Sequence, residues 1–546
     1  MTRRRILALA LAALASACAG PNKASAPAQP PAPAARADAP GQAIPAEAKA
    51  RAAPEAQPKP PAPAGEQAAP ASHRFKAPQK APPPELRLPA QKHFALANGL
   101  KVRLVEYERL PIVALNLVAD AGGSRDPGDR PGLASFTAAM LTEGTKTRTA
   151  TQISDEAGFL GSSLSASAGT DAASLGGATL SKHLPRFLAL FADVAMNPAF
   201  RKADFDRVQD ERLVTLLQQR DQPQALASRR FGPVFWGKHP YGHYLLGTEE
   251  AVRSMRPRDL AAFHDRHWRP SNAELVVVGD VSEAELRPLL EKTLGSWRAG
   301  TSAPSLAAEG PAAPKRTILL EKPDAPQAYL LLGMPGLKRS SEAYVASTVA
   351  FQVLGGGMSS RLFRNLREEK GYTYGIYARG DARRLAGASF IVGSVRADVT
   401  GAALKELLRE IDRVREEPVS EDELNEAKSA LVLGLPADFA TAGAIAGRLA
   451  DLSVQGLPDD YWNRYADEVE KVTADDVRRF AQSGLDPSRL TIVVVANPEV
   501  VKPQLAGLPI GPLELEVPPP PVAKPPGARP PAPKPAAARG APRPSR

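Results

Sequence analysis

One pattern occurs twice in this chain, and this repeat restricts the possible folds more than any other feature of the sequence. Residues 259–280 read as the end of a helix, a Pro-Ser turn and a β-branched strand, and residues 476–497 read the same way. Corresponding residues are 217 positions apart throughout. A constant spacing across three kinds of element indicates two homologous halves, which we place at residues 93–300 and 316–512. A linker rich in Pro, Ala and Gly separates them.

Strands and helices come in groups within each half. Groups of strands followed by groups of helices predict α+β domains, in which helices pack on one face of a mainly antiparallel sheet. Ser420 and Glu423 form a capping-box signature at the start of one predicted helix. The hydrophobic periodicity predicts strands at 100–105, 112–119, 328–333 and 388–395, and helices at 133–141, 184–196, 205–219, 257–267, 342–354, 402–415 and 420–433.

Both ends of the chain differ from this body in composition. Of the 55 prolines, 18 lie in residues 21–90 and 12 in residues 517–546. Few large apolar residues accompany them, so we expect residues 19–92 to be a disordered tether and residues 517–546 an unstructured tail. The tail carries six basic residues and no acid, which accounts for most of the net charge of +10. The excess of positive charge therefore lies mainly in the C-terminal tail and not in a groove on the folded body. We accordingly expect no nucleic-acid binding. Contact of this tail with anionic lipid or cell-wall polymer is an alternative.

The N-terminus has the features of a secretory signal. A positive start at residues 1–5 precedes a short apolar run, small residues and Cys18, the single cysteine of the chain. This arrangement resembles a bacterial lipoprotein signal of residues 1–18, in which Cys18 is acylated. Ala19 follows where Asp would favour the inner membrane, so we expect attachment to the outer membrane, with the body facing the periplasm. The alternative is an ordinary signal cleaved near Ala17.

Several stretches match one protein family in the same order as they occur there. They extend over about residues 93–512 and lie at 98–102, 132–145, 239–242, 247–249, 269–272 and 354–362. Together they resemble the insulinase/pitrilysin family of zinc peptidases, in the branch like mitochondrial processing peptidase. The resemblance implies that the two α+β halves form a clamshell around a chamber that receives peptide or unfolded protein.

The zinc motif of that family is degenerate in this chain. Active members carry His-x-x-Glu-His in the segment that corresponds to residues 132–145, where the two His bind zinc and the Glu acts as general base on a bound water. The corresponding residues here are Ser135, Ala138 and Ala139. Alignment on Glu211 places the family's acidic third ligand at Gln218. None of the four supplies a ligand of the required kind, so we expect no zinc on this chain.

Other candidate sites are weaker. His264 and His267, and His239 and His243, lack a Glu at motif spacing, and we interpret both pairs as surface or capping histidines. Ser135 lacks the Gly-x-Ser-x-Gly elbow of a serine nucleophile. The glycines at 355–357 are not followed by the Lys-Ser/Thr of a phosphate-binding loop.

One part of the family's substrate site is retained. Residues 366–374 resemble the segment in which an Arg and a Tyr, seven positions apart, bind the substrate backbone across the chamber from the zinc. These residues are Arg367 and Tyr374 here. Both types of side chain donate hydrogen bonds suited to a carbonyl oxygen. Without the resemblance, Arg367 would be interpreted as a surface helix residue and Tyr374 as a strand core residue.

The resemblance implies a function in a complex. Family members of this kind pair with a sibling subunit that keeps the zinc motif, so we expect this chain to supply the Arg/Tyr part of a shared site. The alternative is a non-enzymatic peptide-binding or scaffold lipoprotein of the cell envelope. Catalysis by unrecognised residues is a third hypothesis.

Overall fold

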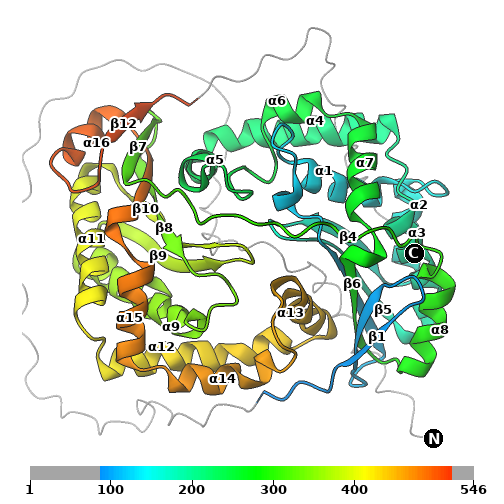
Figure 1. The fold of residues 1–546 in the computed structure, drawn as a ribbon. Coiled ribbons are helices and arrows are strands. Elements are labelled where there is room, and N and C mark those ends of the chain that lie inside the picture. Colours follow the sequence, from blue (N-terminus) through cyan, green and yellow to red (C-terminus); the bar gives the residue numbers. More distant parts are fainter. Residues whose placement is uncertain (1–85, 519–546) are drawn as a thin grey trace, which may run out of the picture. The chain divides into compact units, whose positions relative to one another are not determined.

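The computed structural model describes residues 86–518, which all belong to one unit, Pro83–Arg546. The expected signal with Cys18, the tether up to residue 85 and the tail from residue 519 lie outside the described residues. Two six-stranded sheets with helices make up the described part (Figure 1), so the predicted α+β class is confirmed.

The first sheet has the strand order β1-β2-β6-β3-β5-β4. β2 and β6 pair in parallel, and the other neighbours are antiparallel. Its strands are β1 (Lys92–Ala95), β2 (Lys101–Glu106), β3 (Ile112–Ala119), β4 (Ser163–Ala168), β5 (Ala173–Leu180) and β6 (Ala273–Gly279). The helices of this half are α1 (Leu133–Met140), α2 (Ala150–Phe159), α3 (Leu184–Met196), α4 (Lys202–Gln218), α5 (Pro223–Trp236), α6 (Glu249–Ser254), α7 (Pro257–His267) and α8 (Glu283–Leu294).

The second sheet has the order β12-β7-β11-β8-β10-β9, so its five strands from β7 to β9 repeat the first sheet's order from β2 to β4. Its strands are β7 (Arg316–Glu321), β8 (Gln327–Gly336), β9 (Thr373–Ala382), β10 (Gly387–Arg396), β11 (Thr491–Ala496) and β12 (Leu513–Glu516). Its helices are α9 (Tyr344–Gly355), α10 (Arg361–Phe363), α11 (Thr400–Glu416), α12 (Glu421–Gly434), α13 (Ala442–Gln455), α14 (Tyr461–Lys471), α15 (Ala474–Gly484) and α16 (Pro498–Leu505). A π-helical turn, Arg364–Glu369, follows α10.

Each half covers the second face of the other half's sheet with one helix. α13 packs on β3 and β6 of the first sheet, where Leu449 joins Val276 and Val278 in one core cluster. β6 and β11 are apolar over nearly their whole length and buried on both faces, which requires cover on both sides. The expectation of helices on only one face was therefore incomplete.

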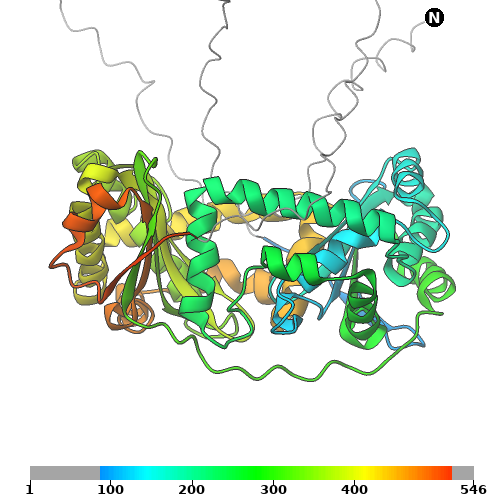
Figure 2. The same ribbon diagram turned by 90° about the horizontal axis from the view of Figure 1, so that it is seen from above.

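The reciprocal helix is α5, which packs on β8 and β11 of the second sheet. Phe231 stacks on Phe235, with ring centroids 4.7 Å apart, and both share a core cluster with Val493. A Cβ atom at Gly333 would lie 2.1 Å from the Phe231 ring, so this close contact requires glycine. Figure 2 shows the connector between α8 and β7 as an extended segment that passes from one sheet to the other.

The ordered body is longer than expected at both ends. The backbone N–H of Leu88 donates to Asn463 Oδ1 at 3.0 Å, and Gln91 Nε2 donates to the carbonyl of Asp459 at 2.7 Å. Residues 86–92, which were expected in the tether, thus contact the second half. At the other end, β12 pairs with β7 beyond the expected limit at residue 512.

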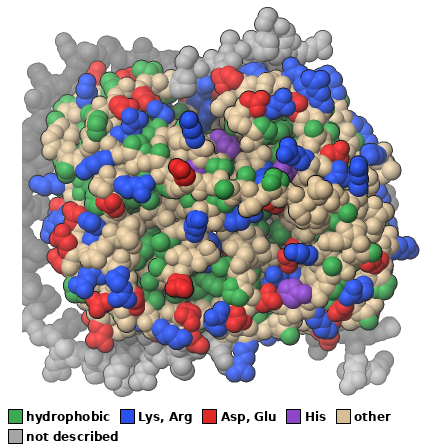
Figure 3. Space-filling model, viewed as in Figure 1, with side chains coloured by type: hydrophobic (Ala, Val, Ile, Leu, Met, Phe, Trp, Pro, Cys, Tyr) green, Lys and Arg blue, Asp and Glu red, His purple; other side chains and the backbone are tan. Residues whose placement is uncertain are grey.

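Basic and acidic side chains are interspersed over the face of the molecule that Figure 3 shows. This agrees with the inference that the net positive charge does not belong to a basic groove on this face. Within residues 86–518, no single helix is long and apolar enough to cross a membrane. One bent pair of helical segments, Glu421–Phe439 and Ala442–Gln455, meets the criteria for a membrane span by length and apolar composition, and by these alone.

Candidate functional site

The helix that carries the degenerate motif, α1, is fixed at its N-terminus by Asp126. This buried carboxylate accepts hydrogen bonds from the backbone N–H groups of Gly132 and Ala134, both at 2.7 Å. Gly132 has φ 93°, and a Cβ atom there would lie 2.7 Å from the backbone nitrogen of Gly247. The segment around Gly247 therefore lies directly against the start of α1.

The three motif positions are occupied by small side chains on α1. Ala138 is fully buried and Ala139 is half-buried. Ser135 Oγ donates to the carbonyl of Leu245 and accepts a hydrogen bond from Arg212 Nη1 at 2.8 Å. Because the hydroxyl proton goes to a carbonyl and a cation binds the oxygen, Ser135 is not arranged as an activated nucleophile.

The α4 residue that contacts the motif is Arg212, which the sequence analysis did not single out. Its guanidinium carbon lies 4.8 Å from the centre of the Phe136 ring, and Nη1 also lies 3.4 Å from the carbonyl of Leu246. Gln218, the position aligned with the acidic ligand, is instead exposed at the end of α4. A signal for Arg212 was present, because it lies on the apolar face formed by Phe205, Val208, Arg212 and Leu216.

Arg212 brings a buried positive charge to the degenerate motif. Burial lowers the pKa of Arg212 to about 10, and the nearby Asp126 carboxylate opposes this shift. The guanidinium is therefore still charged at neutral pH. Asp126 Oδ2 is also 3.0 Å from His243 Nε2, so Asp126 is engaged by several donors at once.

These residues do not fit a zinc ion. Zinc in proteins takes three or four thiolate, imidazole or carboxylate ligands. The motif offers one hydroxyl and two methyl groups, and Arg212 would face the metal with a like charge. No group of three or more His, Cys, Asp or Glu side chains that could hold a metal occurs anywhere in residues 86–518.

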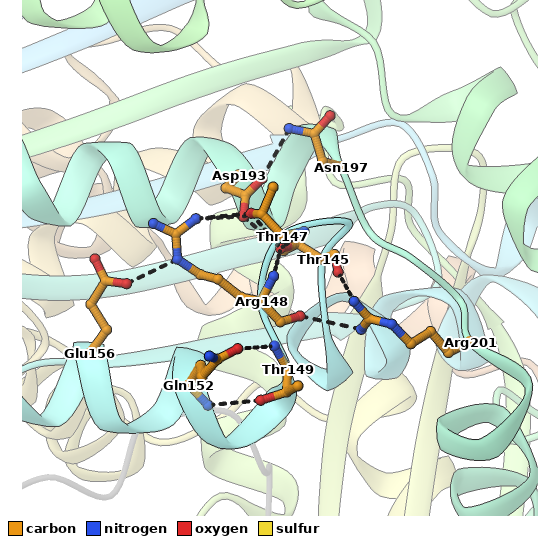
Figure 4. Close-up of polar contacts among 9 residues, drawn as sticks. All are labelled: Thr145, Thr147, Arg148, Thr149, Gln152, Glu156, Asp193, Asn197 and Arg201. Atoms are coloured by element: carbon orange, nitrogen blue, oxygen red, sulfur yellow. Dashed lines mark hydrogen bonds and ion pairs between the residues drawn. The ribbon is translucent and has the colours of Figure 1, made fainter.

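A polar network holds the segment that follows α1 (Figure 4). The carboxylate of Asp193 on α3 accepts hydrogen bonds from Thr145 at 2.6 Å, Thr147 at 2.9 Å and Arg148 at 2.7 Å. Burial alone would raise the pKa of Asp193, but these hydrogen bonds and one from Asn197 lower it. The carboxylate therefore stays ionised and fixes the loop between α1 and α2.

His264 and His267 were interpreted as surface or capping histidines, but both are buried on the inner face of α7. His264 Nε2 is 3.0 Å from the carbonyl oxygen of Ala195, which makes this nitrogen a donor. Burial lowers the pKa of each imidazole to about 4. His239 is also buried, and its Nδ1 accepts from the backbone N–H of Tyr241 at 3.0 Å. These are neutral core histidines.

The retained pair lies at the two ends of a turn. Arg367 is exposed on the π-helical turn, and its guanidinium carbon lies 4.6 Å from the centre of the Phe363 ring. Tyr374 is 78% exposed on the edge strand β9, so it is not a strand core residue. The backbone N–H of Tyr372 donates to the carbonyl of Leu366 at 2.8 Å and closes the turn. Both side chains are thus available to a ligand.

The first prediction concerns His264. Its pKa is about 4 in the folded protein and about 6.5 in the unfolded chain. Between pH 4 and pH 6.5, therefore, the unfolded chain binds a proton at His264 that the folded protein does not bind. Stability should therefore fall as the pH drops from 6.5 to 4. In His264→Gln, which keeps a hydrogen-bond donor, this loss of stability should be smaller than in the parent by about 2 to 3 kcal/mol. Urea unfolding at pH 7 and pH 4.5 measures the free energy of unfolding of each protein. The exposed His93→Gln is the control. Equal losses in all three proteins would contradict the assignment.

The second prediction concerns metal. The parent chain should carry less than about 0.1 zinc per molecule, because its motif supplies no ligand set. The variant Ser135→His/Ala138→Glu/Ala139→His, which leaves the exposed Gln218 unchanged, should remain a poor binder while Arg212 is present. Adding Arg212→Leu should tighten zinc binding by about tenfold or more, since a buried like charge within a few ångströms is removed. Competition with a chelating dye measures both affinities, and equal affinities would exclude the proposed repulsion.

Two protein-family models match consecutive parts of the chain. Residues 101–249 match the insulinase family, peptidase family M16, and residues 254–431 match the model described as the peptidase M16 inactive domain. The matches follow the two halves in order, although the second begins at α6 and α7 of the first half. They cover the degenerate motif, Arg367 and Tyr374.

Curated relatives and solved structures agree with these matches. An uncharacterized zinc protease of Mycobacterium leprae is 30% identical over 57% of this chain and 72% of its own length. One from Rickettsia felis is 27% identical over 62% of this chain and 81% of its own. The crystal structure of a peptidase M16 inactive domain from Pseudomonas fluorescens superimposes with a TM-score of 0.70 at 26% identity, covering 74% of this chain and 97% of that one.

A protease from Helicobacter pylori has the same fold, with a TM-score of 0.69 at 19% identity over 75% of this chain and all of that one. The order of the two matched models, the relatives and the repeated sheets lead to one assignment. The chain belongs to the insulinase family of peptidases, M16.

Proposed function

We propose that this chain is a zinc-less subunit that binds peptide substrate and complements a zinc-bearing sibling of the same family. One observation carries the proposal: Arg212 fills the motif on one half, whereas Arg367 and Tyr374 remain exposed on the other.

The pair suits the recognition of a peptide carbonyl. Arg367 presents a planar fork of N–H donors, and its contact with the Phe363 ring restricts the fork's orientation. Tyr374 adds a single O–H donor from a rigid strand. Two positioned donors at one carbonyl stabilise the negative charge that develops there during peptide-bond cleavage. The sibling would supply the metal and the general base.

A non-enzymatic peptide-binding or scaffold protein is the competing function. It uses the same exposed pair and the same filled motif, but it requires no turnover in any complex. The two functions therefore differ in the kinetics of a reconstituted assembly rather than in the geometry of this chain.

We also propose that the chain is a lipoprotein of the bacterial envelope, attached through Cys18 to the outer membrane with its body in the periplasm. The support is the position of the single cysteine directly after a short apolar run and small residues. In that location the folded body would be in the same compartment as peptides of the envelope.

The third prediction tests the retained pair. In a complex reconstituted with the zinc-bearing sibling, Arg367→Ala or Tyr374→Phe should each lower turnover by about 10- to 1000-fold, the effect of losing one positioned donor to an oxyanion. Steady-state cleavage of a fluorogenic peptide measures this. The exposed Arg464→Ala on α14 is the control and should leave turnover unchanged. Parental turnover with both residues changed would favour the scaffold function.

The fourth prediction tests the anchor. Replacement of Cys18 by Ser removes the thiol that lipid attachment requires, so the variant should appear in the soluble fraction or remain unprocessed. Fractionation of membranes, with mass spectrometry of the N-terminal peptide of the parent, measures both properties. Membrane association equal to that of the parent would exclude Cys18 as the anchor.

A further inference from the structure

One face of the second sheet is covered by α5 only in part. α5 packs on β8 and β11, whereas β10 and the edge strand β9 lie beyond them in the sheet. The pairing of β9 with β10 places Ser394 opposite Gly375 and Val392 opposite Tyr377, and Arg379 is the next residue of β9 on this side. Val392 packs against the core cluster of α5, which identifies the face. All five residues keep some exposure, so the β9–β10 part of this face is open to a ligand.

Three side chains on this open face are hydrogen-bond donors without a partner. The hydroxyls of Tyr377 and Ser394 and the guanidinium of Arg379 form no side-chain hydrogen bond or ion pair within the described part of the chain. A Cβ atom at Gly375 would lie 2.8 Å from Tyr377 Oη, so this hydroxyl lies over Gly375, the neighbour of Tyr374 in the chain. The face therefore presents a row of unused donors beside one member of the retained pair.

The charges of these two strands and their connection are paired with one exception. Residues 373–396 contain four Arg and a single acidic residue. Three of the Arg side chains form ion pairs: Arg383 with Asp381, Arg384 with Asp120, and Arg396 with Asp398. The fourth, Arg379, is exposed and has no acidic partner in the described part of the chain. The open face thus carries one unpaired positive charge.

An acidic peptide fits these features best. A carboxylate binds a guanidinium through charge-assisted hydrogen bonds, and peptide carbonyls accept from the hydroxyls of Tyr377 and Ser394. A basic segment would meet Arg379 with a like charge. We propose that this face binds an extended peptide that carries an Asp or Glu side chain at Arg379. This rests on the proposed function, because Arg367 and Tyr374 would hold a carbonyl of the same peptide.

The spacing along β9 indicates where the acidic residue lies in the peptide. Arg379 follows Tyr374 by five residues, which is about 16 Å along a strand at about 3.3 Å per residue. An extended peptide spans this distance in about five residues. At the other end, Glu368 and Glu369 are exposed on the turn that carries Arg367, and they disfavour a second acid there. The selected acid is therefore about five residues from the carbonyl that the pair holds.

Three capped dodecapeptides of Ala, Ser and Thr test the proposal, with Glu, Gln or Lys at both ends so that either chain direction is covered. Isothermal titration calorimetry with the full chain gives the Kd of each. The Glu peptide should bind about fivefold more tightly than the Gln peptide, the effect of one exposed ion pair, and the Lys peptide should bind most weakly. The preference for Glu should decrease when the salt concentration rises from about 50 to 300 mM.

Two variants locate the binding. Arg379→Glu should reverse the order, so that the Lys peptide binds more tightly than the Glu peptide, and its exposed side chain has no partner whose loss would affect folding. Tyr377→Phe should weaken all three peptides by about two- to tenfold, since a donor to the peptide backbone is lost and the ring stays. Arg258→Glu on α7 changes the net charge equally at another exposed Arg and should keep the parental order.

The outcomes separate this proposal from the proposed function. If Arg367→Ala weakens binding but Arg379→Glu leaves the order unchanged, the acidic preference is overturned and the proposed function stands. If Arg379→Glu reverses the order and Arg367→Ala has no effect, the acidic preference stands and the role of the pair fails. An equal effect of Arg258→Glu and Arg379→Glu would show attraction by net charge only and would overturn the preference. Absence of binding by all three peptides at about 1 mM would overturn both proposals.

Discussion

The structure depends on two apolar strands, β6 and β11, that must be covered on both faces. A single half offers helices for only one face of its sheet, so the second face is covered by a helix from the other half. At about 25 cal/mol per Å² of apolar surface, leaving such a face in water would cost many kilocalories per mole. The exchange of α5 and α13 therefore makes each half necessary for the other's stability. It also ties the two sheets of this insulinase-family chain to each other.

Arg212 explains how the fold tolerates the lost motif. Ser135, Ala138 and Ala139 are small side chains, and unfilled space beside them in a packed interior would be destabilising. The Arg212 side chain extends over the Phe136 ring to Ser135, and the Phe136 and Phe205 rings stack at 5.0 Å beside it. The buried guanidinium is costly, as its lowered pKa indicates, and its hydrogen bonds and the nearby Asp126 offset part of this cost. One internal cation thus occupies the region that a metal site would need.

Local periodicity predicted the elements well, because α3, α7 and β3 have the predicted bounds and the Ser420–Glu423 capping box is present. It could also have revealed the buried histidines, since His264 and His267 continue the apolar face of α7 that starts at Leu260. The exchange of α5 and α13 could not be predicted from the sequence. An apolar strand shows that both of its faces need cover but not which helix supplies it. Arg212 was not predicted, because the family motif specifies ligand positions only and carries no information on the buried face of α4.

The two candidate sites differ in the burial of their Arg side chains. On the first half, the charge at the motif is internal: Arg212 is buried, and its acceptors are Ser135 Oγ and the carbonyl of Leu246. On the second half, the charge of Arg367 is external and rests on an aromatic ring beside an exposed Tyr374. A buried cation can stabilise only its own fold, whereas an exposed donor pair on rigid elements can bind another molecule. This asymmetry supports our proposal that the first site has a structural role and that the second binds peptide.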